Sequence, residues 1–327
     1  MAIIMKPFVN HQHSTAHSAS IQSPNTVVMV RPHHFQPNSQ TADDNSFQSV
    51  HLPVDINQLK AIAYQQVTHA AQLLQANGVT VYLFEDTGKT TPDSVFPNNW
   101  FSTQLLPSGE TTLCIFPMYC KNRRPERRID IIEFLQQQFY ISHLLDYRSN
   151  EINNLFLEGT GVMVLDHQAR IAYAARSHRM NEHVLQKFCI ENQYQPLVFN
   201  ATDAQGIPIY HTNVMMSVAD QFVVIALDTI HNLEQRAMVI NSIQQSGKHC
   251  IEISSSQMTQ FAGNVFSLYG NQKQLLVLST TALASLTDHQ QSLLSQWVKL
   301  LAIDVSAIEQ AGGSIRCMLA GIHLIKK

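Results

Sequence analysis

The sequence predicts an α/β protein built from one repeated unit. Short apolar segments of strand length alternate with longer segments whose apolar residues recur at helical spacing. The order of hairpin, helix and strand recurs about five times, or about 65 residues per unit in a chain of 327 residues. The composition, with 45% hydrophobic and 14% charged residues, is typical of a globular chain that buries a core. Periodicity alone does not distinguish a doubly wound sheet from a propeller.

The first unit shows how the elements are identified. An apolar run at 26–30 predicts a buried strand, and residues 55–76 carry apolar side chains at helical spacing. Asn77 and Gly78 form a C-terminal cap for this helix, and a second strand is predicted at 79–84. The same patterns predict helices at 127–138, 181–191, 233–245 and 288–301, and strands at 111–116, 141–145, 161–165, 171–175, 196–199, 214–218, 222–226, 250–253, 265–268, 275–279 and 316–324.

The sequence predicts a flexible N-terminal tail followed by a single domain. Residues 1–24 are assigned to the tail, because most of this stretch is polar and poor in apolar residues, and residues 25–327 to the domain. The formal net charge of -3 argues against a nucleic-acid partner or an anionic membrane surface. No apolar run approaches the roughly 18 residues that span a bilayer, and the first residues are too quickly polar for a signal peptide.

Cysteine and histidine usage argues against disulfide and metal sites. The five cysteines are scattered and contain no CxxC pair, which favours a reducing, cytoplasmic setting. The sixteen histidines place no HxxxH or HExxH motif on a predicted helix. No metal and no cofactor are therefore expected. Most of the cysteines are expected to be small buried hydrophobic residues, namely Cys114, Cys120, Cys189 and Cys250.

Three segments carry side chains that packing alone does not explain. Glu158 follows an apolar segment and precedes two glycines that permit close approach of a backbone or ligand. His211 and Asn213 are two residues apart, so on an extended chain they point to the same side. Gly312 and Gly313 form a flexible turn that delivers Cys317 to the beginning of the predicted last strand. In isolation His211 is more often a core histidine and Glu158 a turn residue.

Together these segments resemble the guanidino-modifying enzyme superfamily, which includes arginine deiminases, dimethylarginine hydrolases and amidinotransferases. The resemblance covers roughly residues 25–325. Within the superfamily, the chain is most similar to the subgroup of citrulline-utilisation hydrolases. It implies a pentein fold, a five-bladed propeller of ββαβ units with an active site in the central cavity. The motifs that carry it are VRP at 30–32, PNNW at 97–100, LEGTG at 157–161, HTNVMMS at 211–217 and GGSIRCM at 312–318.

The resemblance implies a role for each matching residue. Cys317 matches the nucleophile, His211 the general acid and base, and Glu158 the carboxylate that orients the histidine. Arg179 matches an arginine that binds the α-carboxylate of the substrate, and either Arg123 or Arg124 is expected to be a second one. A thiolate suits this chemistry independently, since a guanidino or ureido carbon is a poor electrophile and needs a strong nucleophile.

The substrate expected is a small molecule, citrulline rather than arginine. Arginine deiminases place two aspartates around the guanidinium, whereas this chain has Asn99 and Asn213 at these positions, and Gly161 replaces a further acidic residue. An asparagine amide offers a donor and an acceptor, which matches a neutral ureido group better than a cation. The predicted reaction yields ornithine, carbon dioxide and ammonia.

Alternatives remain at this point. An arginine deiminase, an arginine dihydrolase and an amidinotransferase use the same three catalytic residues, and some dihydrolases of the superfamily have asparagine at the first position. A non-catalytic binding protein on the same fold is the alternative from another class, although Cys317, His211 and Glu158 are all retained here. The sequence is also compatible with a homodimer.

Overall fold

The computed structural model describes residues 22–42, 44–49 and 53–327. Most of the predicted tail, residues 1–21, lies outside the described residues. Gln22 is buried, and its side-chain amide donates hydrogen bonds to the carbonyl oxygens of Leu165 (3.0 Å) and Val218 (3.2 Å). The part of the predicted tail that is described therefore packs against the domain.

Four three-stranded sheets share one topology. In each, a hairpin is followed by a helix and by a third strand that pairs in parallel with the second strand of the hairpin. The α/β class predicted from the alternation is confirmed. The sheets are β3 (Phe101–Leu105), β4 (Thr111–Ile115) and β6 (His143–Asp146); β7 (Val164–Asp166), β8 (Ile171–Ala175) and β9 (Gln195–Phe199); β10 (Met216–Val218), β11 (Phe222–Ile225) and β12 (His249–Glu252); and β13 (Phe266–Gly270), β14 (Lys273–Ser279) and β15 (Lys299–Ile303).

The fifth sheet joins the two ends of the domain. β1 (Thr26–Pro32) pairs in parallel with β2 (Thr80–Asp86) and antiparallel with β16 (Ala320–Gly321). A further antiparallel pair links β5 (Phe139–Tyr140) to β17 (Ile325–Lys326). The C-terminal segment therefore takes the place that the first strand of a hairpin has in the other four sheets.

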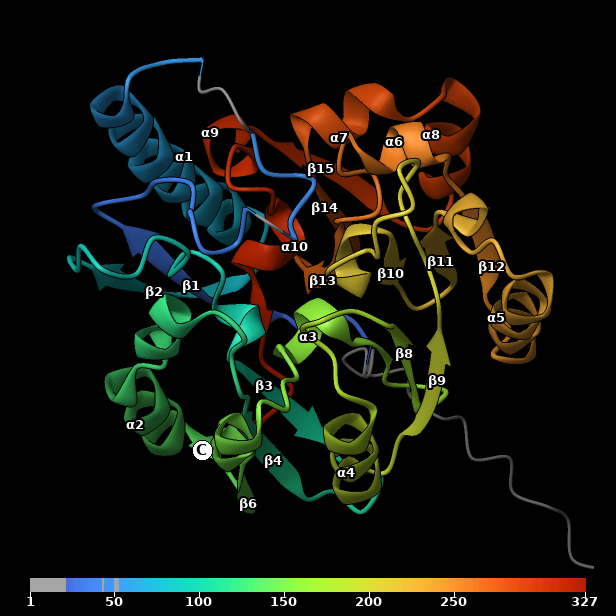
Figure 1. The fold of residues 1–327 in the computed structure, drawn as a ribbon, viewed down its shortest axis with the longest axis horizontal. Coiled ribbons are helices and arrows are strands. Elements are labelled where there is room, and N and C mark those ends of the chain that lie inside the picture. Colours follow the sequence, from blue (N-terminus) through green and yellow to red (C-terminus); the bar gives the residue numbers. More distant parts are fainter. Residues whose placement is uncertain (1–21, 43, 50–52) are drawn as a thin grey trace, which may run out of the picture.

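Each parallel pair is connected by helix, as parallel strands require. Figure 1 shows the connecting helices at the rim, whereas α3 (Gly159–Val162) and α10 (Ile315–Met318) lie near the centre. The connecting helices are α1 (Ile56–Ala76), α2 (Ile129–Gln138), α4 (Glu182–Asn192), α5 (Leu233–Gln245), and α7 (Thr280–Ser285) with α8 (Asp288–Leu294). Short α6 (Ser255–Met258) and α9 (Ser306–Glu309) complete the α-helices of the described residues.

The boundaries of α1 follow from its capping residues. The Asp55 side chain accepts hydrogen bonds from the backbone N–H groups of Asn57 and Gln58, which caps the N-terminus. Asn77 ends the helix, and Gly78 follows with φ +82°. A Cβ at Gly78 would lie 2.5 Å from the backbone nitrogen of Asn271, so this turn requires glycine.

Two predicted elements are wrong. The helix predicted at 288–301 ends at Leu294, and β15 follows, because Leu301 and Ile303 are buried where β15 pairs with β14. The strand predicted at 316–324 is instead the one-turn helix α10 followed by two-residue β16, so Cys317 lies on a helix and not at the start of a strand. In addition, β3 was not predicted, and α3 replaces the beginning of the strand expected at 161–165.

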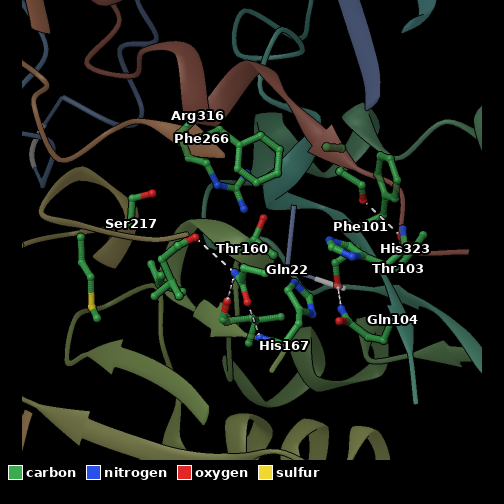
Figure 2. A pocket seen from close by; sticks show the side chains of 17 residues that line it. Gln22, Phe101, Thr103, Gln104, Thr160, His167, Ser217, Phe266, Arg316 and His323 are labelled. Atoms are coloured by element: carbon green, nitrogen blue, oxygen red, sulfur yellow. Dashed lines mark hydrogen bonds between the residues drawn. The ribbon is translucent and has the colours of Figure 1, made fainter. Parts of the chain in front are cut away.

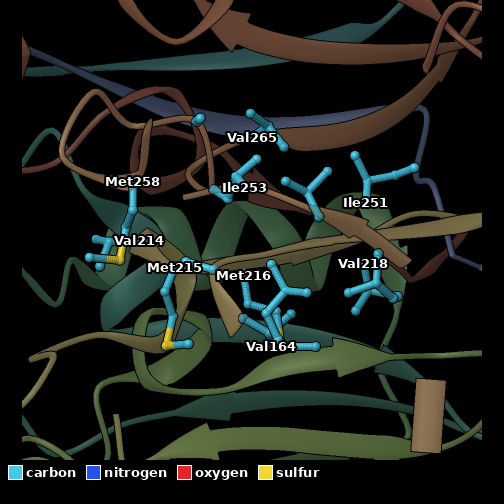
Figure 3. Close-up of a cluster of buried hydrophobic side chains, with 14 of the residues drawn as sticks. Val164, Val214, Met215, Met216, Val218, Ile251, Ile253, Met258 and Val265 are labelled. Carbon is cyan, nitrogen blue, oxygen red and sulfur yellow. The ribbon is translucent and has the colours of Figure 1, made fainter. Parts of the chain in front are cut away.

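A buried apolar cluster fixes the segment that carries His211 and Asn213. Figure 3 shows Val214, Met215 and Met216 among side chains from neighbouring sheets, including Val164 and Val265. All five are at most 7% exposed. Displacing this segment would open cavities in the core, so its polar residues are held firmly in place.

No helix in the described part of the chain is long and apolar enough to cross a membrane. The cytoplasmic setting and the homodimer remain predictions.

Candidate active site

Four short segments converge at the centre of the molecule. They are α3, α10 and the 3-10 helices η1 (Pro97–Asn99) and η4 (Thr212–Val214), and α3 contacts both η1 and η4 while α10 contacts η1. The cavity among them has about 10 Å³ of free volume, roughly the space for one water. It is lined by Thr41, Asn45, Asp93, Phe96, Asn99, Arg123, Arg179, Tyr210, His211, Ala311, Gly313 and Cys317.

Glu158 and His211 form a buried hydrogen-bonded pair. The carboxylate Oε2 of Glu158 lies 2.8 Å from Nε2 of His211, and its Oε1 accepts a hydrogen bond from the backbone N–H of Tyr119 at 2.9 Å. Burial raises the pKa of Glu158, but Arg179, His211 and Arg123 outweigh this and hold the pKa below its usual range. The ionised carboxylate accepts a hydrogen bond from the Nε2–H group, which leaves Nδ1 of His211 as the atom that takes up and releases a proton.

His211 is a neutral imidazole at neutral pH. Burial lowers the pKa of His211 to about 4, against the opposing effect of Glu158, and Arg179 and Arg123 lower it further. Gly161 lies next to the ring, since a Cβ at this position would be 2.8 Å from Nδ1 of His211. Any larger side chain at Gly161 would displace the ring, which explains why a glycine stands there.

Two asparagine amides surround the sulfur of Cys317. Nδ2 of Asn264 lies 3.3 Å from Sγ and Nδ2 of Asn213 lies 3.5 Å from it. The backbone N–H of Arg316 donates to Oδ1 of Asn264 at 3.1 Å, which fixes the orientation of that amide. Burial raises the pKa of the Cys317 thiol, partly offset by Asn264, so the thiol is protonated at rest and the amides stabilise the thiolate when it forms.

Arg179 is buried and forms a forked ion pair with Asp44. Its Nε donates to Oδ2 of Asp44 at 2.8 Å and its Nη2 contacts the other carboxylate oxygen. The guanidinium also lies 3.5 Å from Glu158 and 4.8 Å from the centroid of the Tyr210 ring. Arg179 thus binds the Asp44 carboxylate with the same forked geometry that is expected for the α-carboxylate of a substrate.

Arg123 is likewise buried, whereas Arg124 is not in the cavity. Arg123 donates to both carboxylate oxygens of Glu126 at 3.0 and 2.9 Å, and lies 3.5 Å from Asp93 and 3.6 Å from Glu158. Arg124 is partly exposed and instead donates to the carbonyl oxygen of Met118 at 3.2 Å. Of the two candidates, the structure brings only Arg123 to the site.

Asn99 presents an unpaired donor to the site. Nη2 of Arg123 donates to Oδ1 of Asn99 at 3.1 Å, so the Asn99 Nδ2 points the other way. This Nδ2 is buried and has no hydrogen-bond partner among the described residues. A Cβ at Gly161 would lie 2.4 Å from it, which places the donor beside the His211 ring.

Two carboxylates of the site are not among the residues predicted from the sequence. Asp93 lines the cavity, and Asp44 forms an ion pair with Arg179. Burial raises the pKa of Asp93, and its Oδ1 has no partner in the described chain. Asp93 stands four residues before the PNNW motif at 97–100, and this proximity was the available signal. Nothing in the sequence around Asp44 indicates its contact.

No group of three or more metal-ligating side chains occurs in the part of the chain that is described.

The sequence matches a known protein family over most of its length. The family model for N,N dimethylarginine dimethylhydrolase, eukaryotic, matches residues 31–324. A search of curated proteins finds no match.

Several solved structures are similar in fold. Apo ArgZ, an arginine dihydrolase from the ornithine-ammonia cycle in cyanobacteria, superposes with a TM-score of 0.69 at 14% identity, over 90% of this chain and 40% of ArgZ. The N-terminal domain of ArgZ bound to substrate gives 0.68 at 15% identity, over 91% of this chain and 99% of that domain. A dimethylarginine dimethylaminohydrolase adduct with S-methyl-L-thiocitrulline gives 0.61 at 14% identity, over 93% and 100%. The chain therefore spans well under half of full-length ArgZ but nearly all of its N-terminal domain.

Proposed function

The chain belongs to the N,N dimethylarginine dimethylhydrolase family of the pentein, guanidino-modifying superfamily. From the hydrogen-bonding groups of the site we infer that it hydrolyses the ureido C–N bond of citrulline. It is a hydrolase of C–N bonds in arginine-type molecules. We further infer that its five sheets form a five-bladed propeller around the cavity, supported by the pairing of β16 with β1. The similar ArgZ and dimethylarginine structures support a small arginine-related substrate.

The mechanism begins with proton transfer from the thiol. Nδ1 of neutral His211 accepts the Cys317 proton, and the thiolate attacks the ureido carbon. The imidazolium, held by Glu158, then protonates the departing amine, so that ammonia leaves and a thiocarbamate remains on Cys317. His211 next deprotonates a water that attacks this carbonyl. The resulting carbamic acid of ornithine loses carbon dioxide, and the thiol is regenerated.

The unpaired Asn99 donor is the observation that supports citrulline. A ureido oxygen is a hydrogen-bond acceptor, whereas a guanidinium has only donors and would leave Nδ2 of Asn99 facing another N–H. A buried donor without an acceptor costs about 1–3 kcal/mol. The two amides on the Cys317 sulfur are also neutral, and they stabilise the thiolate without requiring a cationic substrate.

Arginine, hydrolysed twice, is the second candidate, and Asp93 is the observation that favours it. Asp93 lines the cavity with an unpaired carboxylate oxygen, which is a suitable partner for a guanidinium. In a citrulline complex this oxygen would instead pair with the α-ammonium group, so the kinetic comparison of the two substrates decides between them.

Replacing Asn99 by aspartate tests this choice. Asn99→Asp keeps an acceptor for Arg123 and exchanges the free N–H₂ donor for a carboxylate oxygen. We expect the ratio of kcat/KM for citrulline over arginine to fall by about a hundredfold, since each 1.4 kcal/mol corresponds to a factor of ten. Steady-state kinetics with both substrates measures the ratio.

Asn213→Asp provides the contrast. The sequence analysis assigns Asn213 to the substrate, but the structure places its amide 3.5 Å from the Cys317 sulfur. The added charge should therefore reduce turnover of both substrates and leave the ratio nearly unchanged. An Asn99→Asp enzyme with the ratio of the native protein would remove Asn99 from substrate selection.

Arg179 is expected to bind the α-carboxylate of the substrate, which would displace Asp44. Arg179→Ala should lower kcat/KM for citrulline by about two to four decades, the cost of breaking a buried ion pair. KM should rise, and kcat should fall as well, because Arg179 lies 3.5 Å from Glu158 and lowers the pKa of both Glu158 and His211. Arg124→Ala is the matched control, and it should change kcat/KM by less than about threefold, as partly exposed ion pairs contribute little. Equal losses in the two variants would contradict the assignment.

A further inference from the structure

A second cavity lies on the other side of α10 from the catalytic one. Cys317 lines the catalytic cavity, and the preceding residue, Arg316, lines the second. Figure 2 shows Arg316 extending into this space together with Thr160, Ser217 and His167. The free volume of the cavity is about 30 Å³, which is roughly the space for two waters.

Arg316 has no carboxylate partner in the described chain. Its Nη1 donates to the carbonyl oxygen of Leu319 at 3.0 Å, and its guanidinium lies 4.1 Å from the centroid of the Phe266 ring. None of the ion pairs of the described residues involves it. The sequence of residues 1–21 contains no aspartate or glutamate. Burying a guanidinium without a counter-charge is costly, which points to an anion from solution.

Arg170 and Lys248 add positive potential near the cavity, although Lys248 is paired with Asp166 at 3.0 Å. Burial lowers the pKa of His167 well below its usual range, and His323, Arg170, Arg316 and Lys248 lower it further. Burial also lowers the pKa of Arg316, to about 10, so the guanidinium stays charged at neutral pH while His167 is neutral. Cys317 is the one group that raises the pKa of Arg316, and its thiol is uncharged at rest.

We propose that this second cavity binds a small monovalent anion of the size of chloride, with the Arg316 guanidinium as its charged ligand and the Ser217 hydroxyl available as a neutral donor. Space for about two waters suits an ion of the size of chloride. Because Arg316 adjoins Cys317, the bound anion cancels the positive field that stabilises the thiolate. Chloride therefore stabilises the fold and makes Cys317 less nucleophilic. This proposal does not depend on the identity of the substrate.

The test replaces gluconate, which is too large for the cavity, by chloride at constant ionic strength. The full chain is followed by its thermal midpoint Tm and by the rate at which iodoacetamide alkylates Cys317, resolved by peptide mass spectrometry from the other cysteines. We expect chloride to raise Tm, as any ligand of the folded state does. It should slow alkylation of Cys317 by up to about tenfold, the effect of one unit in the thiol pKa.

Three variants decide the outcome. Arg316→Gln and Ser217→Leu, the second of which fills the cavity and keeps the arginine, should both lose the two chloride responses. Arg148→Gln, at an exposed arginine paired with Asp146, should keep them. If Arg316→Gln does not fold, Ser217→Leu alone carries the test. A chloride response that persists in either cavity variant, or that is absent from the native protein, would overturn the proposal.

Discussion

Cys317→Ala is expected to reduce kcat by at least about four decades, because it removes the nucleophile on which the covalent intermediate forms. Cys317 is the one cysteine that lines the cavity formed by the described residues, and two amide groups point to its sulfur. The substitution removes one buried sulfur, so the protein should remain folded. Steady-state assay of ammonia release, with circular dichroism to verify folding, measures the effect.

The remaining cysteines are controls for this result. Cys250 is exposed, so the expectation that it is buried is wrong. Burial raises the pKa of the thiols of Cys114, Cys120 and Cys189 to about 12, so all three are protonated and unreactive. Serine at any of these four positions should leave kcat within about a factor of three and change stability at most. An active Cys317→Ala protein would contradict the mechanism.

His211→Ala is expected to lower kcat by about two to four decades, the usual contribution of a general acid and base. The variant lacks both the acceptor for the thiol proton and the donor for the leaving amine. Glu158→Gln should be impaired as well, because the carboxylate that holds Nε2 at 2.8 Å loses its charge. The measurement is kcat of each single variant and of each double variant that also carries Cys317→Ala.

The combined variants test whether the three residues act as one unit. Adding His211→Ala to Cys317→Ala should cost almost nothing further, since residues of one catalytic unit are not additive. His211→Gln, which keeps a polar side chain, separates loss of proton transfer from loss of packing. A folded His211→Ala protein with native kcat would remove the acid and base assignment.

The fold was predictable where local signals and burial agree. The helix expected at 233–245 coincides with α5, because apolar spacing and the Asn232 cap indicate the same bounds. At 288–301 helical spacing and burial disagreed, and pairing with β14 converted the second half into β15. The one-turn helix α10 was read as a strand, because its four residues are too few to show a helical period.

The site was predictable to the extent that its residues lie in motifs. Five of these residues lie in the motifs named in the sequence analysis, namely Asn99, Glu158, His211, Asn213 and Cys317. Arg123 and Arg179 lie outside those motifs and were assigned from the family resemblance. The structure places all seven in or beside the central cavity. Arg124 adjoins Arg123, but the direction of each side chain depends on η2 (Lys121–Glu126), which the sequence does not reveal. Asp44 meets Arg179 across 135 positions, and no local pattern indicates such a contact.

The central claim is that the native enzyme hydrolyses citrulline. The most direct measurement is to incubate the full chain with citrulline or with arginine at equal concentration and to quantify ornithine, citrulline and ammonia over time, with Cys317→Ala as the blank. The account predicts that citrulline gives ornithine and ammonia in equal amounts, with kcat/KM at least about a hundredfold above that for arginine. Preferred turnover of arginine, with two ammonia per ornithine or with citrulline as the end product, would contradict the ureido assignment.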